Sequence, residues 1–187
     1  MSSLPPDDTI LGLLAVRARH GYEILDCFND PGQLGEVWQI STSQVYAVLK
    51  RLEAQGLTCG YERTAADAPT RTEYRLTSTG ELRLALWLNE PAPSSSIHRV
   101  RVEFLSRLYI ARLLNVPTVP IVERQKAACQ QQKTHTVNRL KHALPGIGRL
   151  TLELVISQLD AVLLWLDRCE LVPHAPDRRE STPELQL

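Results

Sequence analysis

The order of elements along residues 20–76 constrains the fold more than any other feature of this 187-residue chain. Two short helical patterns come first, and the second runs from Ser41 to Gln55 with apolar residues on one face. Serine residues at its start can cap the helix, and Gly56 suits the left-handed residue that often ends one. An alternating ribbon then turns near residues 65–69 and returns. This order predicts a winged helix-turn-helix, a fold typical of proteins that bind DNA.

The outer face of the second helix is polar and basic, which suits a recognition helix that enters the major groove. Ser43, Gln44 and Lys50 are expected to lie nearest the bases, with the Gln44 amide contacting a base edge. Arg63 and Arg71 flank the turn of the ribbon and are expected to contact phosphates. The complete set of residues predicted to contact DNA is Tyr22, Ser41, Thr42, Ser43, Gln44, Tyr46, Lys50, Arg51, Arg63 and Arg71.

The sequence HGYE at residues 20–23 precedes a serine-rich start, a VYxxLKRLExxGL helix and a ribbon that ends as xYRLTxxG. Over about residues 11–88 this combination resembles the PadR family of bacterial transcriptional regulators, in its long form with a helical C-terminal domain. Family members often have a proline after the helix tyrosine, where this chain has Ala47, and a Gly- and Arg-rich wing tip. The resemblance implies a homodimeric repressor that binds an inverted-repeat operator in double-stranded DNA.

Composition divides the chain into four parts: a winged helix-turn-helix domain at 1–90, a Pro/Ser linker at 91–96, a helical dimerisation domain at 97–171 and a tail at 172–187 expected to be disordered. The fold class is therefore mainly α-helical with a small β-wing. In the first part we expect a helix capped by Thr9 and ending near Arg19, and a second helix from Gly21 to Asn29. Strands are expected at Leu57–Arg63 and Arg71–Leu76, followed by a helix capped by Thr77 or Ser78. The helices expected after the linker are Ile97–Asn115, 120–143 and Leu150–Leu171. The side chains expected to face inward from the helix after the ribbon are Leu82, Ala85, Leu86 and Trp87.

The last predicted helix carries a heptad-like apolar stripe, larger than a thin helical layer can readily cover. The stripe, helped by the helix that begins near Ile97, is therefore expected to pair with a second subunit. Twofold pairing would place two recognition helices on successive major grooves, about 34 Å apart along the duplex. The residues predicted for dimerisation are Phe104, Leu108, Leu152, Val155, Leu159, Val162 and Leu166.

The resemblance also implies an effector site, because some relatives release DNA when a small aromatic or drug-like ligand enters near the domain junction. The residues that would line such a pocket here are Trp87, Phe104, Tyr109 and Trp165. Plain core packing is the competing interpretation, because large aromatic side chains dominate protein cores. Only 5% of the residues are aromatic, which argues against a large aromatic cleft.

The charge of the two halves leaves a second function class open. Residues 1–90 contain 8 basic and 12 acidic residues, whereas residues 91–187 contain 13 basic and 9 acidic residues. A net charge of −4 is unexpected for a half that binds a polyanion. The alternative is therefore a winged-helix module that binds protein and has no affinity for DNA.

Motifs for catalysis, cofactors and metals are missing from the sequence. No nucleophile elbow, phosphate-binding loop, dinucleotide glycine pattern or zinc-protease motif occurs, so no enzyme is predicted. The histidines outside HGYE are expected to be solvated, and the four well-separated cysteines to be reduced thiols. No apolar run is long enough to span a membrane and no signal peptide is recognisable, so we expect a cytoplasmic protein with neither cofactor nor metal.

Overall fold

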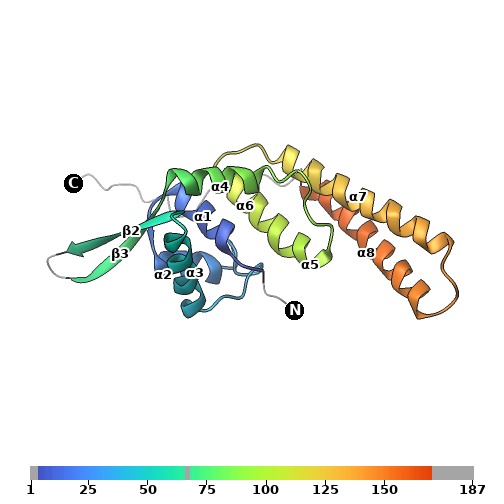
Figure 1. The fold of residues 1–187 in the computed structure, drawn as a ribbon, viewed down its shortest axis with the longest axis horizontal. Coiled ribbons are helices and arrows are strands. Elements are labelled where there is room, and N and C mark those ends of the chain that lie inside the picture. Colours follow the sequence, from blue (N-terminus) through green and yellow to red (C-terminus); the bar gives the residue numbers. More distant parts are fainter. Residues whose placement is uncertain (1–3, 66–67, 170–187) are drawn as a thin grey trace, which may run out of the picture.

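A computed structural model describes residues 4–65 and 68–169, with side chains outside 63–70. The chain is mainly helical with one three-stranded antiparallel sheet, as the sequence predicts (Figure 1). Its elements are α1 (Asp7–Val16), β1 (Arg19–His20), α2 (Gly21–Asn29), α3 (Thr42–Ala54), β2 (Thr58–Ala65), β3 (Ala68–Leu76), α4 (Ser78–Leu88), α5 (Ile97–Arg99), the π-helical turn η1 (Val100–Phe104), α6 (Leu105–Leu113), α7 (Val119–Lys141) and α8 (Ile147–Cys169). The predicted tail at 172–187 lies outside the described residues.

The wing is a β2–β3 hairpin whose strands are longer than predicted, since they reach Ala65 and begin again at Ala68. The sheet order is β1-β3-β2, because the two-residue strand β1 pairs with the base of β3. That short strand was not predicted, since two residues carry no alternation that could be recognised. Figure 1 shows the wing at one end of the molecule and the α7–α8 hairpin at the other.

Local signals placed the ends of α3 correctly. The Ser41 hydroxyl accepts a hydrogen bond from the backbone N–H of Gln44, and Gly56 has a φ of 68° just beyond the C-terminal end. The predicted Thr9 cap is wrong, because α1 already begins at Asp7, after Pro6, and Thr9 is buried within it. Two aspartates in the first turn favour this earlier start, since negative charge stabilises a helix N-terminus.

The face of α4 that points inward differs from the prediction. Leu84 and Leu88 are buried, whereas Leu82 and Leu86 are 69% and 72% exposed. The cause is Gly80, one turn earlier on the same face, which lies so close to β2 that an added Cβ would sit 2.1 Å from the backbone oxygen of Leu57. Ala85 is also exposed and Trp87 is half-buried, so the predicted inward set is wrong for three of its four members.

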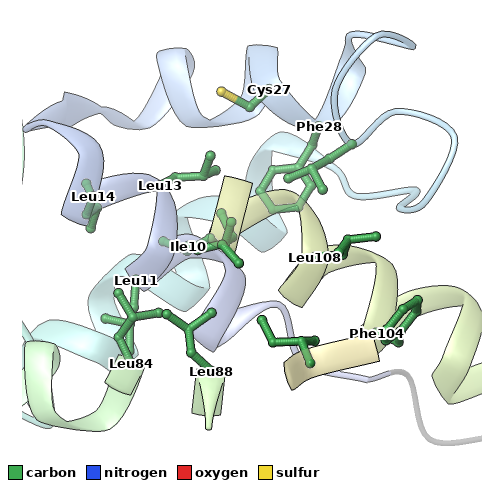
Figure 2. Packing of buried hydrophobic residues seen from close by; sticks show 14 of the residues in the cluster. Ile10, Leu11, Leu13, Leu14, Cys27, Phe28, Leu84, Leu88, Phe104 and Leu108 are labelled. Carbon is green, nitrogen blue, oxygen red and sulfur yellow. The ribbon is translucent and has the colours of Figure 1, made fainter. Parts of the chain in front are cut away.

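One apolar core joins the winged half to the helices that follow. Figure 2 shows Leu11 of α1 next to Leu84 and Leu88 of α4, with α6 packed close by. The long helix predicted at Ile97–Asn115 is present as the continuous run α5–η1–α6. Helix α6 is buried over much of its surface, and Ile110 packs directly on Gly12 of α1.

Polar contacts hold residues 91–96 against the helices around them. The backbone oxygen of Ser94 accepts a hydrogen bond of 2.9 Å from Nε2 of the buried Gln125. Arg107 and Arg124 donate to the last carbonyls of α4, which a helix end leaves without partners. The C-terminal end of α4 is thereby anchored to both α6 and α7.

Within the residues that the structure describes, none of the helices is both long and apolar enough to cross a membrane.

We predict that Gly12→Ala destabilises the fold, although alanine normally favours a helix interior. A Cβ at this position would lie 2.4 Å from Cγ2 of Ile110, a fully buried side chain. Overpacking of this kind costs about 1–3 kcal/mol in the free energy of unfolding, measurable by chemical denaturation. Gly148→Ala in α8 is the matched control, since a Cβ there meets nothing within 4 Å. Equal stability of the two variants would contradict the tight α1–α6 contact.

Candidate nucleic-acid interface

The exposed face of α3 is a row of small and basic side chains. Ser43, Ala47 and Lys50 follow one another at helical spacing and are all exposed, opposite the buried Val45 and Leu49. Among the described residues Lys50 has no ion-pair partner, so its charge is available to a ligand. Ser43 and Ala47 are short, and Lys50 adds a positive charge, a combination that suits a DNA groove.

Gln44 is partly engaged by the helix cap itself. Its side-chain Oε1 accepts a hydrogen bond of 2.7 Å from the backbone N–H of Ser41, while its own backbone N–H donates to the Ser41 hydroxyl. These two reciprocal bonds form a capping box, which satisfies N–H groups that a helix start leaves unpaired. The sequence predicts a DNA contact for Gln44, and its capping role was not predicted, although the S-x-x-Q spacing indicates it.

Tyr46 lies on the side of α3 that faces α2 and the wing. Its ring covers Gly21, where an added Cβ would lie 2.7 Å from two ring carbons. A larger residue at this position of HGYE would therefore require the Tyr46 ring to shift. The ring nevertheless remains 40% exposed, so its hydroxyl end can reach solvent or a ligand.

A cluster of three side chains joins α2 to the wing. The rings of His20 and Tyr22 are stacked, with centroids 5.7 Å apart and planes 6° from parallel. The Arg71 guanidinium lies 5.3 Å from the centroid of the Tyr22 ring and donates to its hydroxyl at 3.2 Å. Because the Tyr22 oxygen accepts this bond, its own O–H proton is left for an external acceptor.

These side chains surround a hollow of about 480 Å³ between α2, α3 and β3. The hollow is lined by His20, Gly21, Tyr22, Tyr46, Arg71, Thr72 and Tyr74. Phenol hydroxyls and a guanidinium at its rim are donors of the kind that phosphate oxygens accept. The structure thus brings together Tyr22, Tyr46 and Arg71, three of the residues predicted to contact DNA.

Glu23 completes the HGYE motif by holding the start of α2. Its carboxylate accepts a hydrogen bond of 2.7 Å from the backbone N–H of His20 and pairs with Arg17 at 2.8 Å. Burial acts to raise the pKa of Glu23, but these two partners outweigh it and hold the pKa below its ordinary value. The carboxylate therefore remains charged at neutral pH and stabilises the helix end that carries Tyr22.

Arg51 is predicted to contact DNA, but the structure places it in an ion pair at the start of α1. Its Nη2 lies 2.6 Å from Oδ2 of Asp7, and Nε also donates to that carboxylate. Arg83 of α4 pairs in the same way with Asp8 at 2.8 Å. Two acidic residues of the winged half therefore neutralise neighbouring arginines rather than opposing an incoming polyanion.

The wing register places Arg63 directly opposite Arg71. The side chain of Arg63 lies outside the described residues, so its predicted phosphate contact stays a prediction.

The predicted dimerisation stripe of α8 is turned toward α7 of the same chain. Leu159 and Leu166 are 2% and 0% exposed within the single chain, and Leu152, Val155 and Val162 are half-buried. Phe104 and Leu108 of the same predicted set are also buried. A second row on α8 remains in solvent and was missed, although it has the same heptad spacing: Ile147, Leu150, Leu154, Ala161 and Leu164.

The four aromatic residues predicted for an effector pocket make three different kinds of contact. Phe104 and Trp165 are in edge-to-face contact, with centroids 5.9 Å apart. Trp87 lies under the Arg107 guanidinium, and the Tyr109 hydroxyl donates to Gln33. Within the described ranges, no group of three or more His, Cys, Asp or Glu side chains could hold a metal ion.

Comparison with known proteins adds to this geometry. The family model described as "Transcriptional regulator PadR-like family" matches residues 10–86, which include α2, α3 and the wing. The chain belongs to the PadR-like family of transcriptional regulators. The family consists of regulators rather than enzymes, in agreement with a sequence that carries no catalytic motif.

Two curated relatives show how far the similarity extends. The "Negative transcriptional regulator PadR" of Bacillus subtilis (strain 168) is 31% identical over 108 residues, which is 57% of this chain and 56% of that protein. The chain thus spans little more than half the length of this relative. A protein of Lysinibacillus sphaericus is 32% identical over 91 residues, which is 49% of this chain and 82% of that protein.

Solved structures of PadR-like proteins also align with this chain. The Bacillus subtilis PadR structure in complex with operator DNA has a TM-score of 0.45 and 21% identity, over 89% of this chain and 97% of that chain. The same protein in complex with p-coumaric acid has a TM-score of 0.41 and 21% identity, over 89% of this chain and 95% of that one.

We predict that two substitutions of Gln44 separate its role in the helix cap from any contact with DNA. Gln44→Ala removes the acceptor for the Ser41 N–H and should lower the free energy of unfolding by about 0.5–1 kcal/mol. Gln44→Glu retains an acceptor at this third helical position and should leave stability unchanged. Denaturant unfolding of both variants measures the difference. If both were equally destabilised, the capping role would be refuted.

Proposed function

We propose that this PadR-like regulator binds double-stranded DNA sequence-specifically through α3 and the wing, acts as a homodimeric repressor, and recognises an inverted-repeat operator. The observation that carries the proposal is the exposed row Ser43, Ala47 and Lys50 lying beside the Tyr22–Arg71 pair. A row of short side chains suits a groove, and the adjacent donors suit the phosphates that border it. Repression is supported by the relative from Bacillus subtilis, which is a negative transcriptional regulator.

In this proposal, the position of each residue on the exposed face of α3 and the wing decides whether it contacts a base or a phosphate. Ser43 and Lys50, with the donors of the Gln44 amide, contact base edges, and the Ala47 methyl leaves room for the groove floor. Tyr22, Tyr46, Arg63 and Arg71 contact phosphates, while Ser41 and Thr42 lie at the helix start, where backbone N–H groups favour an anion. Arg51 contributes little, because Asp7 already neutralises it.

We predict that Arg71→Ala weakens binding to all duplexes alike and lowers the slope of log affinity against log salt by about one unit, because one phosphate contact is lost. Duplexes selected from a randomised library provide the specific target, and affinities at two salt concentrations provide the slope. Arg99→Ala is the matched control, since it removes the same charge from α5 and breaks only an exposed i,i+4 pair with Glu103. An unchanged slope for Arg71→Ala would show that Arg71 does not contact a phosphate.

A protein-binding winged helix without DNA affinity is the second candidate function, and the net charge of −4 over residues 1–90 favours it. The same library selection decides between the two. Failure of the wild-type chain to select any duplex at low salt, where phosphate contacts are strongest, would leave the protein-binding module as the function.

Dimerisation is proposed through the exposed row on α8 rather than through the stripe first predicted. Ile147, Leu150, Leu154 and Leu164 are 81%, 60%, 58% and 63% exposed, respectively. Apolar side chains repeated at heptad spacing along one exposed helix face favour pairing with another helix. The buried stripe around Leu159 then acts indirectly, by holding α8 on α7.

We predict that Leu154→Glu produces a folded monomer, whereas Leu159→Glu prevents stable folding of the hairpin. The first places a charge at a solvent-exposed site, and the second buries an unpaired charge, which costs about 4 kcal/mol or more. Sedimentation at micromolar concentration, together with thermal unfolding, separates the two effects. A wild-type chain that is monomeric under these conditions would refute the dimer.

Response to a small-molecule effector is also part of the proposal. One solved relative contains p-coumaric acid, and this chain brings the predicted residues Phe104 and Trp165 into contact between η1 and α8. A planar ligand at this point would have to separate the two rings. Quenching or a shift of tryptophan fluorescence on titration with aromatic acids tests for such entry.

A further inference from the structure

The segment between α2 and α3 is hydrogen-bonded to α6 at two points. Nε1 of Trp38 donates to the Ser106 hydroxyl at 2.8 Å, and the Tyr109 hydroxyl donates to Oε1 of Gln33 at 2.7 Å. Ser106 and Tyr109 are three residues apart and so lie on the same face of α6. These bonds connect the winged half to a helix about 70 positions further along the chain.

The segment is itself tightly held, so a displacement at one point moves all of it. The side chain of Leu34 is fully buried, and its backbone N–H donates to the oxygen of Cys27. Trp38 packs edge-on against Phe28, with ring centroids 6.1 Å apart and planes at 89°. Only two residues separate Trp38 from Ser41, which caps α3. The indole therefore lies three residues before the N-terminal cap of α3.

The hydrogen bond between Ser106 and Trp38 is buried at the Ser106 hydroxyl, as expected of a contact that fixes the position of its partner. Ser106 is 0% exposed, in a helix whose other buried side chains are mostly apolar. A buried hydroxyl costs free energy unless it is hydrogen-bonded, and deleting either partner leaves the other unsatisfied. Alanine at this position would fill the same helix site without a polar group, so packing alone does not account for the hydroxyl.

Helix α6 is also attached to α8 and α4. Nη2 of Arg112 donates to the backbone oxygen of Cys169 at 3.2 Å, close to the end of α8. Phe104, immediately before α6, contacts Trp165 of α8, and Arg107 donates to the end of α4. Helix α6 thus makes side-chain contacts with both α8 and the segment before α3.

We propose that Ser106 and Tyr109 are positioning residues for the recognition helix, and that through them α6 couples the placement of α8 to the placement of α3. The inference rests on the proposed function, because affinity for DNA is the main quantity measured in its test. It assigns to Trp38 and Gln33, which do not belong to the DNA-binding face, an effect on sequence discrimination. Because the coupling uses two identified contacts, it can be tested by a mutant cycle.

The test combines Ser106→Ala with Trp38→Phe, which removes only the indole N–H donor and part of the ring. Each single variant should lower affinity for the selected operator about fivefold, the equivalent of one hydrogen bond. The double variant should lose little more than either single variant, because both changes delete the same bond. Affinity for non-specific duplex should stay unchanged, since phosphate contacts do not depend on the fine placement of α3.

Thr134→Ala is the control, because this exposed hydroxyl on α7 donates to the backbone oxygen of Gln130 in its own helix and lies outside both the α3 face and the exposed row of α8. It should change neither affinity. Additive losses in the Ser106–Trp38 cycle would overturn the proposal. So would equal losses on specific and non-specific DNA, because those would report general destabilisation.

Hydrogen exchange separates this inference from the proposed function. The amides of residues 43–45, in the first turn of α3, should exchange faster in Ser106→Ala than in Thr134→Ala. If the wild-type chain selected no duplex, the proposed function would fail. The hydrogen-exchange rates alone would then decide whether Ser106 positions the start of α3. Equal exchange rates in the two variants would refute it.

Discussion

The close approach of α1 to α6 at Gly12 is the contact on which the arrangement of the two halves depends. With no Cβ at residue 12, the Ile110 side chain fits against the α1 backbone, and α6 lies deep in the core. Only from that depth can Arg107 reach the end of α4 and Ser106 reach Trp38. A wider separation would expose apolar surface on both helices and break polar contacts that are buried together.

The acidic character of the N-terminal half becomes intelligible once its ion pairs are located. Asp7 and Asp8 lie in the first turn of α1, where they favour the helix dipole, and each also pairs with an arginine. Glu23 caps α2 and Asp30 accepts bonds from the turn that follows. These carboxylates serve the internal structure of the winged half, so formal net charge is a poor guide to the charge of its exposed α3 face.

Much of the winged half could be predicted because its signals are local. Both ends of α3 follow from a serine cap and a glycine stop, and α2 begins where HGYE indicates. The inward face of α4 could not be predicted, since it depends on Gly80 meeting the Leu57 backbone. Helix α8 carries two heptad-spaced rows, and only its packing against α7 decides which one is buried. The Trp38–Ser106 bond joins residues 68 positions apart, which no local pattern reveals.

The π-helical turn at Val100–Phe104 has a consequence for how related chains are aligned. A π turn holds one residue more than an α turn, and one residue corresponds to a rotation of about 100° around a helix axis. Removing one residue here would restore an uninterrupted α-helix while leaving α6 in its place against Gly12. A single-residue gap between this chain and a relative within this segment therefore marks the gain or loss of a bulge, with the same residues of α6 still facing the core.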